Sequence, residues 1–317
     1  MSYQIRPAAR TEAKPLVGIY SESGCGKTLS SLYLARGFAG PTGKIVMIET
    51  ESGRGEAFVD LLPGGYEICS MRGNFSPEEY GKALSAVELA NPVALIIDSA
   101  SHEWEGAGGV LSMAADNQIA GKKGPMVWQK PKIDHARHFM LRLLATPIPL
   151  VIVCMRAKYP MEETVVNGKK DWVRSKTLHP KQSEDILFEM FVHGWIDREH
   201  RFHGTKYTRD DLKHVLKDGE PISIRTGEQL AAWARGTGAS PAETAAPSPT
   251  VTSVDLLTQG KFAAKGGTMS VQAWWANLTK EQRSSLQGER ANLKAIAEQA
   301  DREIETAKAD WEATKEQ

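Results

Sequence analysis

The feature that most constrains this chain is residues 21–28, Ser-Glu-Ser-Gly-Cys-Gly-Lys-Thr, which separate a short apolar run from a helix-forming run. Leu16–Tyr20 predicts a buried strand and Lys27–Phe38 predicts a helix. Two glycines and a lysine at that junction predict a loop whose backbone N–H groups surround phosphate at the positive end of the helix dipole. The fold must therefore contain this strand, loop and helix in direct succession.

The segments that follow predict an α/β fold. A helix is expected to open at Ser76, with Pro77 in its first turn and Glu79 placed for a capping box. Lys44–Glu49 predicts a second strand. Two further runs are apolar throughout, as strands buried on both faces are: Val93–Ile97 and Pro149–Met155. Strands that alternate with helices indicate a mostly parallel sheet with right-handed crossovers.

Composition shifts predict three parts: a P-loop domain over 1–235, a flexible linker over 236–252 rich in Ala, Pro, Ser and Thr, and a small helical C-terminal module over 253–317. Short strand-like pieces fill Asp185–Ile224. Two more capping boxes are expected, Thr226 with Gln229, and Thr279 with Gln282 at the start of a long final helix. That helix carries an apolar seam, which predicts packing within a small bundle or, alternatively, a weak coiled coil: Leu286, Leu293, Ala297, Ala300, Ile304, Ala307 and Trp311.

Overall charge and cysteine content are ordinary and set limits on function. Lysine plus arginine and aspartate plus glutamate both number 39, so any nucleic-acid site must come from local charge. The three cysteines have no metal or disulfide spacing, which fits a reducing compartment. No apolar run is long enough to span a membrane and no secretory signal is visible. We expect a cytoplasmic protein without a membrane partner.

The glycine-rich loop predicts a site for ATP and Mg²⁺. Lys27 is expected to reach the β- and γ-phosphates, and the Thr28 hydroxyl to ligate Mg²⁺. Asp98, at the end of a buried strand, is expected to hold the same ion. Ser21 stands where such loops usually begin with glycine, a position that shapes the turn. The predicted nucleotide-binding residues are Ser23, Gly24, Cys25, Gly26, Lys27, Thr28 and Leu29.

The acids and cations around these strands resemble those of the RecA family of recombinases. Asp98 is followed by Ser99, and the strand Lys44–Glu49 runs into Glu51, which matches the family residue that activates the attacking water. The resemblance covers about 15–226 and is closest to core-only RecA-like ATPases of bacteriophages, AAA-domain nucleotide-binding proteins that include single-strand annealing types. It implies that Glu51 and Lys27 are catalytic, and that Arg156 or Lys158 senses the γ-phosphate.

In a RecA-type core, DNA is held by the loops after the Asp98 strand and after the sensor strand. Residues 120–132 contain four lysines and no acid, and residues 156–181 contain seven basic against three acidic residues, with Trp128, Tyr159 and Trp172 interleaved. Cations and stacking rings suit single-stranded DNA; the alternative is ordinary solvated loops with packed tryptophans. The DNA-binding candidates are Lys122, Lys123, Lys158, Lys169, Lys170, Arg174 and Lys176.

The resulting expectation is a Mg²⁺-dependent ATPase that binds single-stranded DNA in phage-type recombination or annealing, as a homo-oligomer. A single-strand-binding protein or another recombination protein is the expected partner of the C-terminal module. Two alternatives stay open, a hexameric DNA helicase or helicase loader, and a nucleotide-gated binding module with little turnover. A metal site is not expected at His193, Asp197, His200 and His203, where a solvent-exposed hairpin is the simpler interpretation.

Overall fold

The computed structural model divides the chain into two compact units, Met1–Ala242 and Glu243–Gln317. It describes residues 13–166, 169–236, 256–257, 260–261, 263–264, 267–276 and 278–315, so the predicted linker lies outside the described residues beyond Gly236. Within the described residues, no helix has the length and apolar character needed to cross a membrane.

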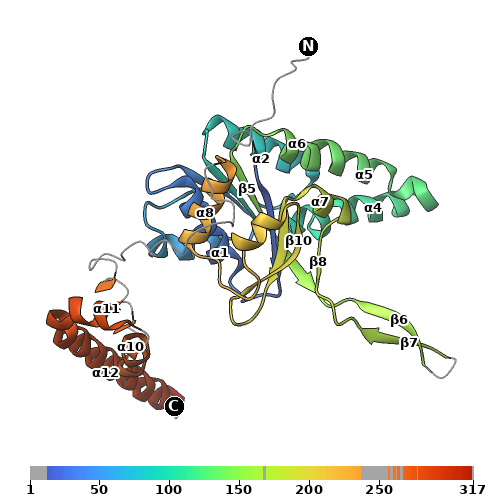
Figure 1. Ribbon diagram of the computed structural model, residues 1–317. Coiled ribbons are helices and arrows are strands. Elements are labelled where there is room, and N and C mark those ends of the chain that lie inside the picture. The colour runs from blue at the N-terminus through green and yellow to red at the C-terminus, as the bar shows by residue number, and fades with distance from the viewer. Residues whose placement is uncertain are drawn as a thin grey trace. The chain divides into compact units, whose positions relative to one another are not determined.

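The first unit is built on a mostly parallel sheet, which confirms the predicted α/β class (Figure 1). β9 and β5 flank β1 in parallel, and β4, β2 and β3 continue the sheet in parallel beyond β5. Of the described strands in this sheet, only β10 and the short β8 pair antiparallel. In spatial order the strands are β10 (Phe202–Tyr207), β9 (Val192–Ile196), β1 (Leu16–Ser21), β5 (Leu150–Lys158), β4 (Ala94–Asp98), β2 (Ile45–Glu49) and β3 (Glu67–Ser70), with β8 (His179–Pro180) beside β5.

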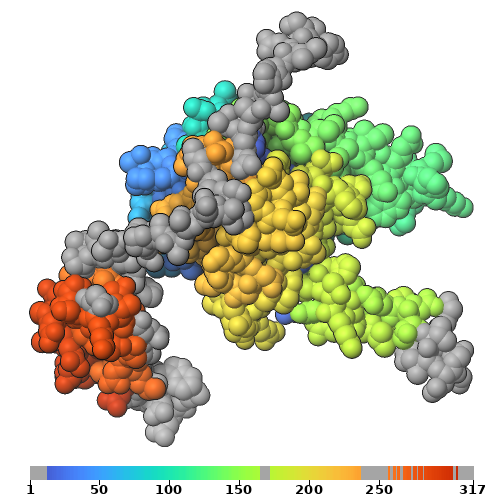
Figure 2. Space-filling view, viewed as in Figure 1, coloured from blue at the N-terminus to red at the C-terminus, as the bar shows by residue number. Residues whose placement is uncertain are grey.

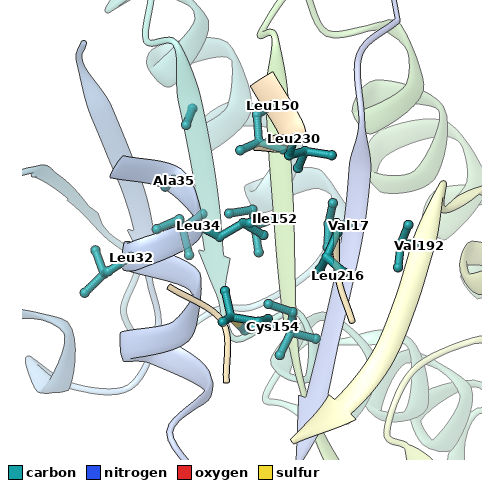
Figure 3. Packing of buried hydrophobic residues seen from close by; sticks show 14 of the residues in the cluster. Val17, Leu32, Leu34, Ala35, Leu150, Ile152, Cys154, Val192, Leu216 and Leu230 are labelled. Atoms are coloured by element: carbon teal, nitrogen blue, oxygen red, sulfur yellow. The ribbon is translucent and has the colours of Figure 1, made fainter. Parts of the chain in front are cut away.

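Each face of this sheet carries its own buried cluster, because successive side chains of a strand point to opposite faces. On one face Val17 and Ile152 pack with Leu34 of α1 (Lys27–Ala39) and Leu230 of α8 (Ile224–Ala234). Figure 3 shows these side chains gathered between the helices and β1, β5 and β9. On the other face, strand residues of the opposite parity pack against α2 (Pro77–Leu89), η4 (His135–Met140) and α6 (Leu141–Ala145).

The two helices on the first face touch through glycine. A Cβ on Gly37 of α1 would lie 1.8 Å from the carbonyl oxygen of Ile224, and one on Gly227 of α8 would lie 2.2 Å from that of Leu34. No side chain fits at such a separation, so the helix backbones approach as closely as they do only because both positions are glycine. This contact holds α8 directly against α1.

Helix capping differs in part from the sequence-based expectation. The Ser76 hydroxyl accepts a hydrogen bond from the Glu79 N–H, as predicted for the start of α2. The predicted Thr226–Gln229 box is wrong, because the box at α8 joins Ser223 to Thr226 and the helix starts earlier. The box of Thr279 with Gln282 is present, but it caps the short α11 (Lys280–Ser285), and the long final helix α12 (Arg290–Lys315) starts later.

The region between β4 and β5 is helical, which the sequence pattern did not reveal. It contains α3 (Ser101–Glu105), α4 (Val110–Ile119), η3 (Gly124–Val127), α5 (Gln129–Asp134), η4 and α6. The other short helices of this unit are η2 (Arg54–Leu61), α7 (Glu184–Glu189) and η5 (Asp210–His214). Beyond β5, the strands β6 (Met161–Val166) and β7 (Lys169–Arg174) form an antiparallel hairpin that stands out from the sheet (Figures 1 and 2).

The second unit is a small helical bundle of α10 (Thr268–Ala276), α11, η6 (Gln287–Glu289) and α12. Leu293 and Ala297 of the predicted seam are buried within it together with Val271, and the Asp301 carboxylate accepts a hydrogen bond from the Thr268 hydroxyl at 2.6 Å. In this part of α12 the seam packs inside the unit. The side chains of Ile304, Ala307 and Trp311 lie outside the described residues.

Candidate functional site

The loop over residues 21–28 lies at the edge where β1 and β4 both end, because parallel strands finish on the same side of a sheet. Gly24 has φ +84° and Gly26 has φ +91°, backbone conformations that glycine adopts without penalty. Gly26 also precedes α1 without a side-chain cap, so the first N–H groups of α1 are left for another acceptor. A bent loop and an uncapped helix start together suit an anion.

The cation of this loop is held by the loop's own oxygens. The ammonium of Lys27 donates to the Ser21 hydroxyl at 3.1 Å, to the Glu22 carbonyl at 3.1 Å and to the Ser21 carbonyl at 3.4 Å. Phosphate oxygens are stronger acceptors for an ammonium group than neutral carbonyls are. Lys27 is therefore placed where it can exchange these bonds for contacts with a polyphosphate.

The residues predicted to hold a metal meet directly. The Thr28 hydroxyl donates to Oδ2 of Asp98 at 2.6 Å, although the two are 70 residues apart in the sequence. Asp98 is buried, and burial raises the pKa of its carboxyl group, an effect that the Thr28 hydrogen bond partly offsets. A hydroxyl and a buried carboxylate are oxygen donors of the kind Mg²⁺ prefers, and Mg²⁺ usually needs only one or two protein ligands besides water and phosphate. The donor set therefore fits this ion.

Glu49, the last residue of β2, and Glu51, in the turn that follows, have different surroundings. The Glu49 carboxylate is 1% exposed; it accepts the N–H groups of Glu51 at 2.7 Å and Gly53 at 3.1 Å and pairs with Arg72 at 2.8 Å. Glu49 thus braces the turn that carries Glu51. The Glu51 side chain, in contrast, faces the cavity beside the loop of residues 21–28 (the phosphate loop).

Arg156, at the end of β5, binds Glu51. Its Nε and Nη2 donate to Oε1 of Glu51 at 3.1 and 3.0 Å. Burial acts to raise the pKa of the Glu51 carboxyl, but the hydrogen bonds and charge of Arg156, with smaller effects of Arg54 and Lys27, outweigh it and leave the pKa below its ordinary value. Of the two cations considered as sensors, Arg156 lines the cavity, whereas Lys158 is exposed and outside the described lining.

These groups surround a cavity of about 970 Å³. Its lining includes the polar side chains of Lys27, Thr28, Asp98, Glu51 and Arg156. Among its other lining residues are Tyr33, Ala57, Phe58, His200, Pro221 and Ile222. The volume lies at the upper end of the range of small-molecule sites. Ser23, Gly24, Gly26 and Leu29 line it as well, but the Cys25 side chain is buried in the core, so of the predicted loop residues only Cys25 turns its side chain away.

His200 is a cavity residue that sequence reasoning missed. Its Nδ1 is hydrogen-bonded to the Cys25 carbonyl at 2.9 Å, and Arg198 of the same turn lies 3.6 Å from the Glu22 carboxylate. The turn after β9 therefore contacts the phosphate loop from 175 residues away in the sequence. Its only local sign is the left-handed backbone of His200, φ 62°, which a sequence does not display.

The expectation of a solvent-exposed hairpin over these histidines is wrong for His193. His193 is buried on β9, and burial, aided by the charge of Lys206, lowers its pKa to about 4. In the turn, Asp197 accepts hydrogen bonds from His203 at 2.8 Å and from Arg201; burial acts to raise its pKa, but these bonds lower it to about 2. Among the described residues, no group of three or more histidine, cysteine, aspartate and glutamate side chains is arranged to hold a metal.

The basic segments expected to be loops are structured. Residues 120–132 follow α4 and contain η3 and part of α5; Lys122 donates to Asn117 and Lys130 pairs with Asp134. Lys123 and Lys176 are exposed. Residues 156–181 form the end of β5 and the β6–β7 hairpin. The side chains of Lys169 and Lys170 lie outside the described residues.

Arg174, at the base of the hairpin, already has partners. Its guanidinium lies 4.7 Å from the ring centroid of Tyr159 and 3.7 Å from the Glu22 carboxylate of the phosphate loop. Trp172 on the same strand is 60% exposed, whereas Trp128 is half-buried. The structure thus exposes Trp172 on the hairpin more than Trp128, and it ties the hairpin base to the loop around Lys27.

No protein-family model matches the chain, and no curated protein matches it. Among solved structures, the chain is similar to one described as a prototypical ATPase from the type III secretion system of pathogenic bacteria, with a TM-score of 0.34 and 15% sequence identity over 60% of this chain. The chain spans 56% of the length of that protein's chain. A likeness of this degree carries no conclusion about fold or function.

Proposed function

We propose that this protein is a Mg²⁺-dependent ATPase with a RecA-like core, acting on single-stranded DNA in recombination or strand annealing. The observation that carries the ATPase proposal is the meeting of Lys27, Thr28, Glu51, Asp98 and Arg156 around one cavity. These five side chains come from four separate elements, and each has the chemistry that γ-phosphoryl transfer to water requires.

In this proposal, the N–H groups of the loop and of the first turn of α1 bind the phosphates, and Lys27 leaves its loop carbonyls to contact the β- and γ-phosphates. The Thr28 hydroxyl and Asp98 hold Mg²⁺, which when bound neutralises charge on the terminal phosphates. Glu51 orients the attacking water and accepts its proton. Arg156 then stabilises charge that develops on the γ-phosphate.

The Glu51–Arg156 ion pair favours a second candidate, a nucleotide-gated binding module with little turnover. A carboxylate whose pKa lies below its ordinary value, and whose Oε1 already accepts two hydrogen bonds, is a weak base. Hydrolysis requires that a ligand draw Arg156 away from Glu51. Phosphate release at steady state, with and without single-stranded DNA, separates the two candidates: turnover that DNA stimulates supports the ATPase, and tight ATP binding without turnover supports the gated module.

The single-stranded DNA part of the proposal is supported by the hairpin that follows β5. It carries Lys169, Lys170 and Arg174 together with an exposed Trp172, and its base contacts Glu22 of the phosphate loop. Cations neutralise phosphates and an exposed ring stacks on bases. The contact through Glu22 offers a route by which nucleotide binding affects the position of the hairpin.

Replacement of Lys169, Lys170 and Arg174 by alanine tests this part. We expect weaker binding of single-stranded DNA and a salt dependence whose slope is shallower by about 0.7 for each phosphate that the variant no longer neutralises. The control variant replaces Arg209, Lys213 and Lys217, which removes the same charge from the η5 region. An unchanged salt slope in the hairpin variant, or an equal loss in the control, excludes the hairpin from the DNA site.

A further inference from the structure

A second cavity, of about 460 Å³, lies in the first unit and shares no lining residue with the candidate active site. Its walls come from α3, from α5 and η4, and from the segment that leads into α7 together with the first turn of that helix. Figure 1 shows α5 and α7 in this part of the unit. Its lining residues include two tryptophans, Trp104 and Trp128, and a set of polar groups. This volume lies within the range of small-molecule sites.

Two lining residues of this cavity, His135 and Gln182, belong to a buried polar network. The Glu103 carboxylate, fully buried, is hydrogen-bonded to Nδ1 of His135 at 3.0 Å and accepts from Nε2 of Gln182 at 3.1 Å. The other ring nitrogen of His135, Nε2, is buried and has no hydrogen-bond partner among the described residues. His135 and Gln182 are the members of this network that line the cavity.

The walls suit a planar ring. Trp104 and Trp128 are both half-buried, so part of each indole remains accessible from the cavity. The Trp104 ring already packs edge-on against His135, with ring centroids 5.5 Å apart and an interplanar angle of 75°. Indole faces stack readily on nucleobases, and they do so with little preference for sequence.

The charges decide which part of a nucleotide fits. The lining carries Lys132 against Glu184 and Asp185, so negative charge exceeds positive and a phosphate group inside the cavity is disfavoured. Residues 120–132, which carry Trp128 and Lys132 of the lining, also contain Lys122 and Lys123, and these two lysines are exposed to solvent. An uncharged base can therefore enter the cavity while lysines nearby neutralise its phosphates.

We propose that this cavity holds one unstacked base of a bound single strand, stacked on Trp128 in a lining that His135 and Gln182 help to form. The inference rests on the proposed function, because it names the base-binding site of the same nucleic-acid ligand. It adds a site separate from the β6–β7 hairpin. This site distinguishes a nucleotide that carries a base from an abasic nucleotide.

The test compares an oligothymidylate with an abasic strand of the same length, so that both probes carry the same phosphates. Affinities of the full chain for both strands are measured by fluorescence anisotropy for the wild type, Trp128→Ala, Trp128→Phe and a control, Trp195→Ala. Trp195 is a half-buried indole on β9 outside this lining. Thermal unfolding and ATP affinity of each variant show whether it is folded.

We expect Trp128→Ala to reduce the preference for the base-bearing strand about five- to a hundredfold, with an unchanged salt slope, and Trp128→Phe to retain most of it. Trp195→Ala should leave the preference intact. If Trp128→Ala leaves the preference for the base-bearing strand unchanged, the cavity proposal alone is overturned. If Trp128→Ala instead changes the oligomeric state, the cavity proposal is also overturned, and the cavity is assigned to a protein contact. Failure of the wild type to bind either strand overturns the proposed DNA function, and the cavity proposal with it.

Discussion

The phosphate loop yields a quantitative prediction at Gly26. Its φ is +91°, and an added Cβ would lie 2.8 Å from Nδ1 of His200, the ring atom that is hydrogen-bonded to the Cys25 carbonyl. Gly24, two residues earlier, has φ +84°, yet its added Cβ would meet no heavy atom within 4 Å. Substitution of Gly24 therefore tests backbone strain alone, whereas substitution of Gly26 tests strain together with a steric clash.

The expected magnitudes follow from these two geometries. A left-handed backbone costs an L-residue about 1–2 kcal/mol, and this cost is common to Gly24→Ala and Gly26→Ala. At Gly26 the His200 ring must also move, which removes a hydrogen bond worth about 0.5–1.5 kcal/mol. We expect the free energy of unfolding to fall by about 1–2 kcal/mol for Gly24→Ala and by about 1.5–3.5 kcal/mol for Gly26→Ala.

Denaturant unfolding of Gly24→Ala, Gly26→Ala, His200→Ala and the Gly26→Ala/His200→Ala double variant measures these terms, provided that the denaturant slope is unchanged. In the His200→Ala background the clash is absent, so the cost of Gly26→Ala should fall to that of Gly24→Ala. ATP affinity should follow the same order, since the ring sets the position of the loop. Equal costs at the two glycines, or no relief by His200→Ala, would refute the claim that His200 braces this loop.

Four further predictions concern single residues. Lys27→Ala should lower ATP affinity at least about tenfold, because a charged hydrogen bond is worth about 1.5–3 kcal/mol; tight binding in calorimetry would contradict the site assignment. Glu51→Gln should retain ATP binding but slow phosphate release by about 10²–10⁴-fold, and an unchanged rate would remove Glu51 from catalysis. Arg36, which is 4% exposed, donates to three loop carbonyls, so Arg36→Met should lower the free energy of unfolding by about 3 kcal/mol or more; a smaller loss would show that water replaces it. The pKa of His193 is about 4 against an ordinary 6.5, so folding favours the neutral imidazole. The contribution of His193 to the free energy of unfolding is complete above pH 6.5. It should be lost as the pH falls toward 4, by at most about 3 kcal/mol. His193→Gln should flatten the stability profile in that window, and a profile that stays steep would assign the effect to other groups.

Local sequence patterns were enough to predict several strands and helices of the first unit. The strands that begin near Leu16 and Ala94 and the helix from Lys27 were predictable, because a run of apolar residues and a glycine-rich junction act over a few neighbours. The sequence pattern did not predict the helices between β4 and β5. Their segments are short, and packing such as that of Phe139 against Tyr80 of α2 makes them stable.

Some residues of the candidate site could be predicted from the sequence, and others could not. Gly24, Gly26, Lys27 and Thr28 could be predicted as a group, because the residues that bend and charge a phosphate loop are adjacent in the chain. The role of Glu49 could not, since it and Glu51 look alike in sequence. Only the structure shows that one carboxylate is buried in its own turn and the other faces the cavity.

Short stretches of sequence specify the first strand, the glycine-bent loop and the helix after it, and also the buried strand that ends in Asp98. Only the folded sheet places β5 between β1 and β4, which brings Arg156 onto Glu51, and only the fold brings the turn of His200 against the loop. This division arises because local conformation depends on neighbouring residues. Contacts between side chains distant in the chain depend instead on strand order and on helix packing, which are set by the whole core at once.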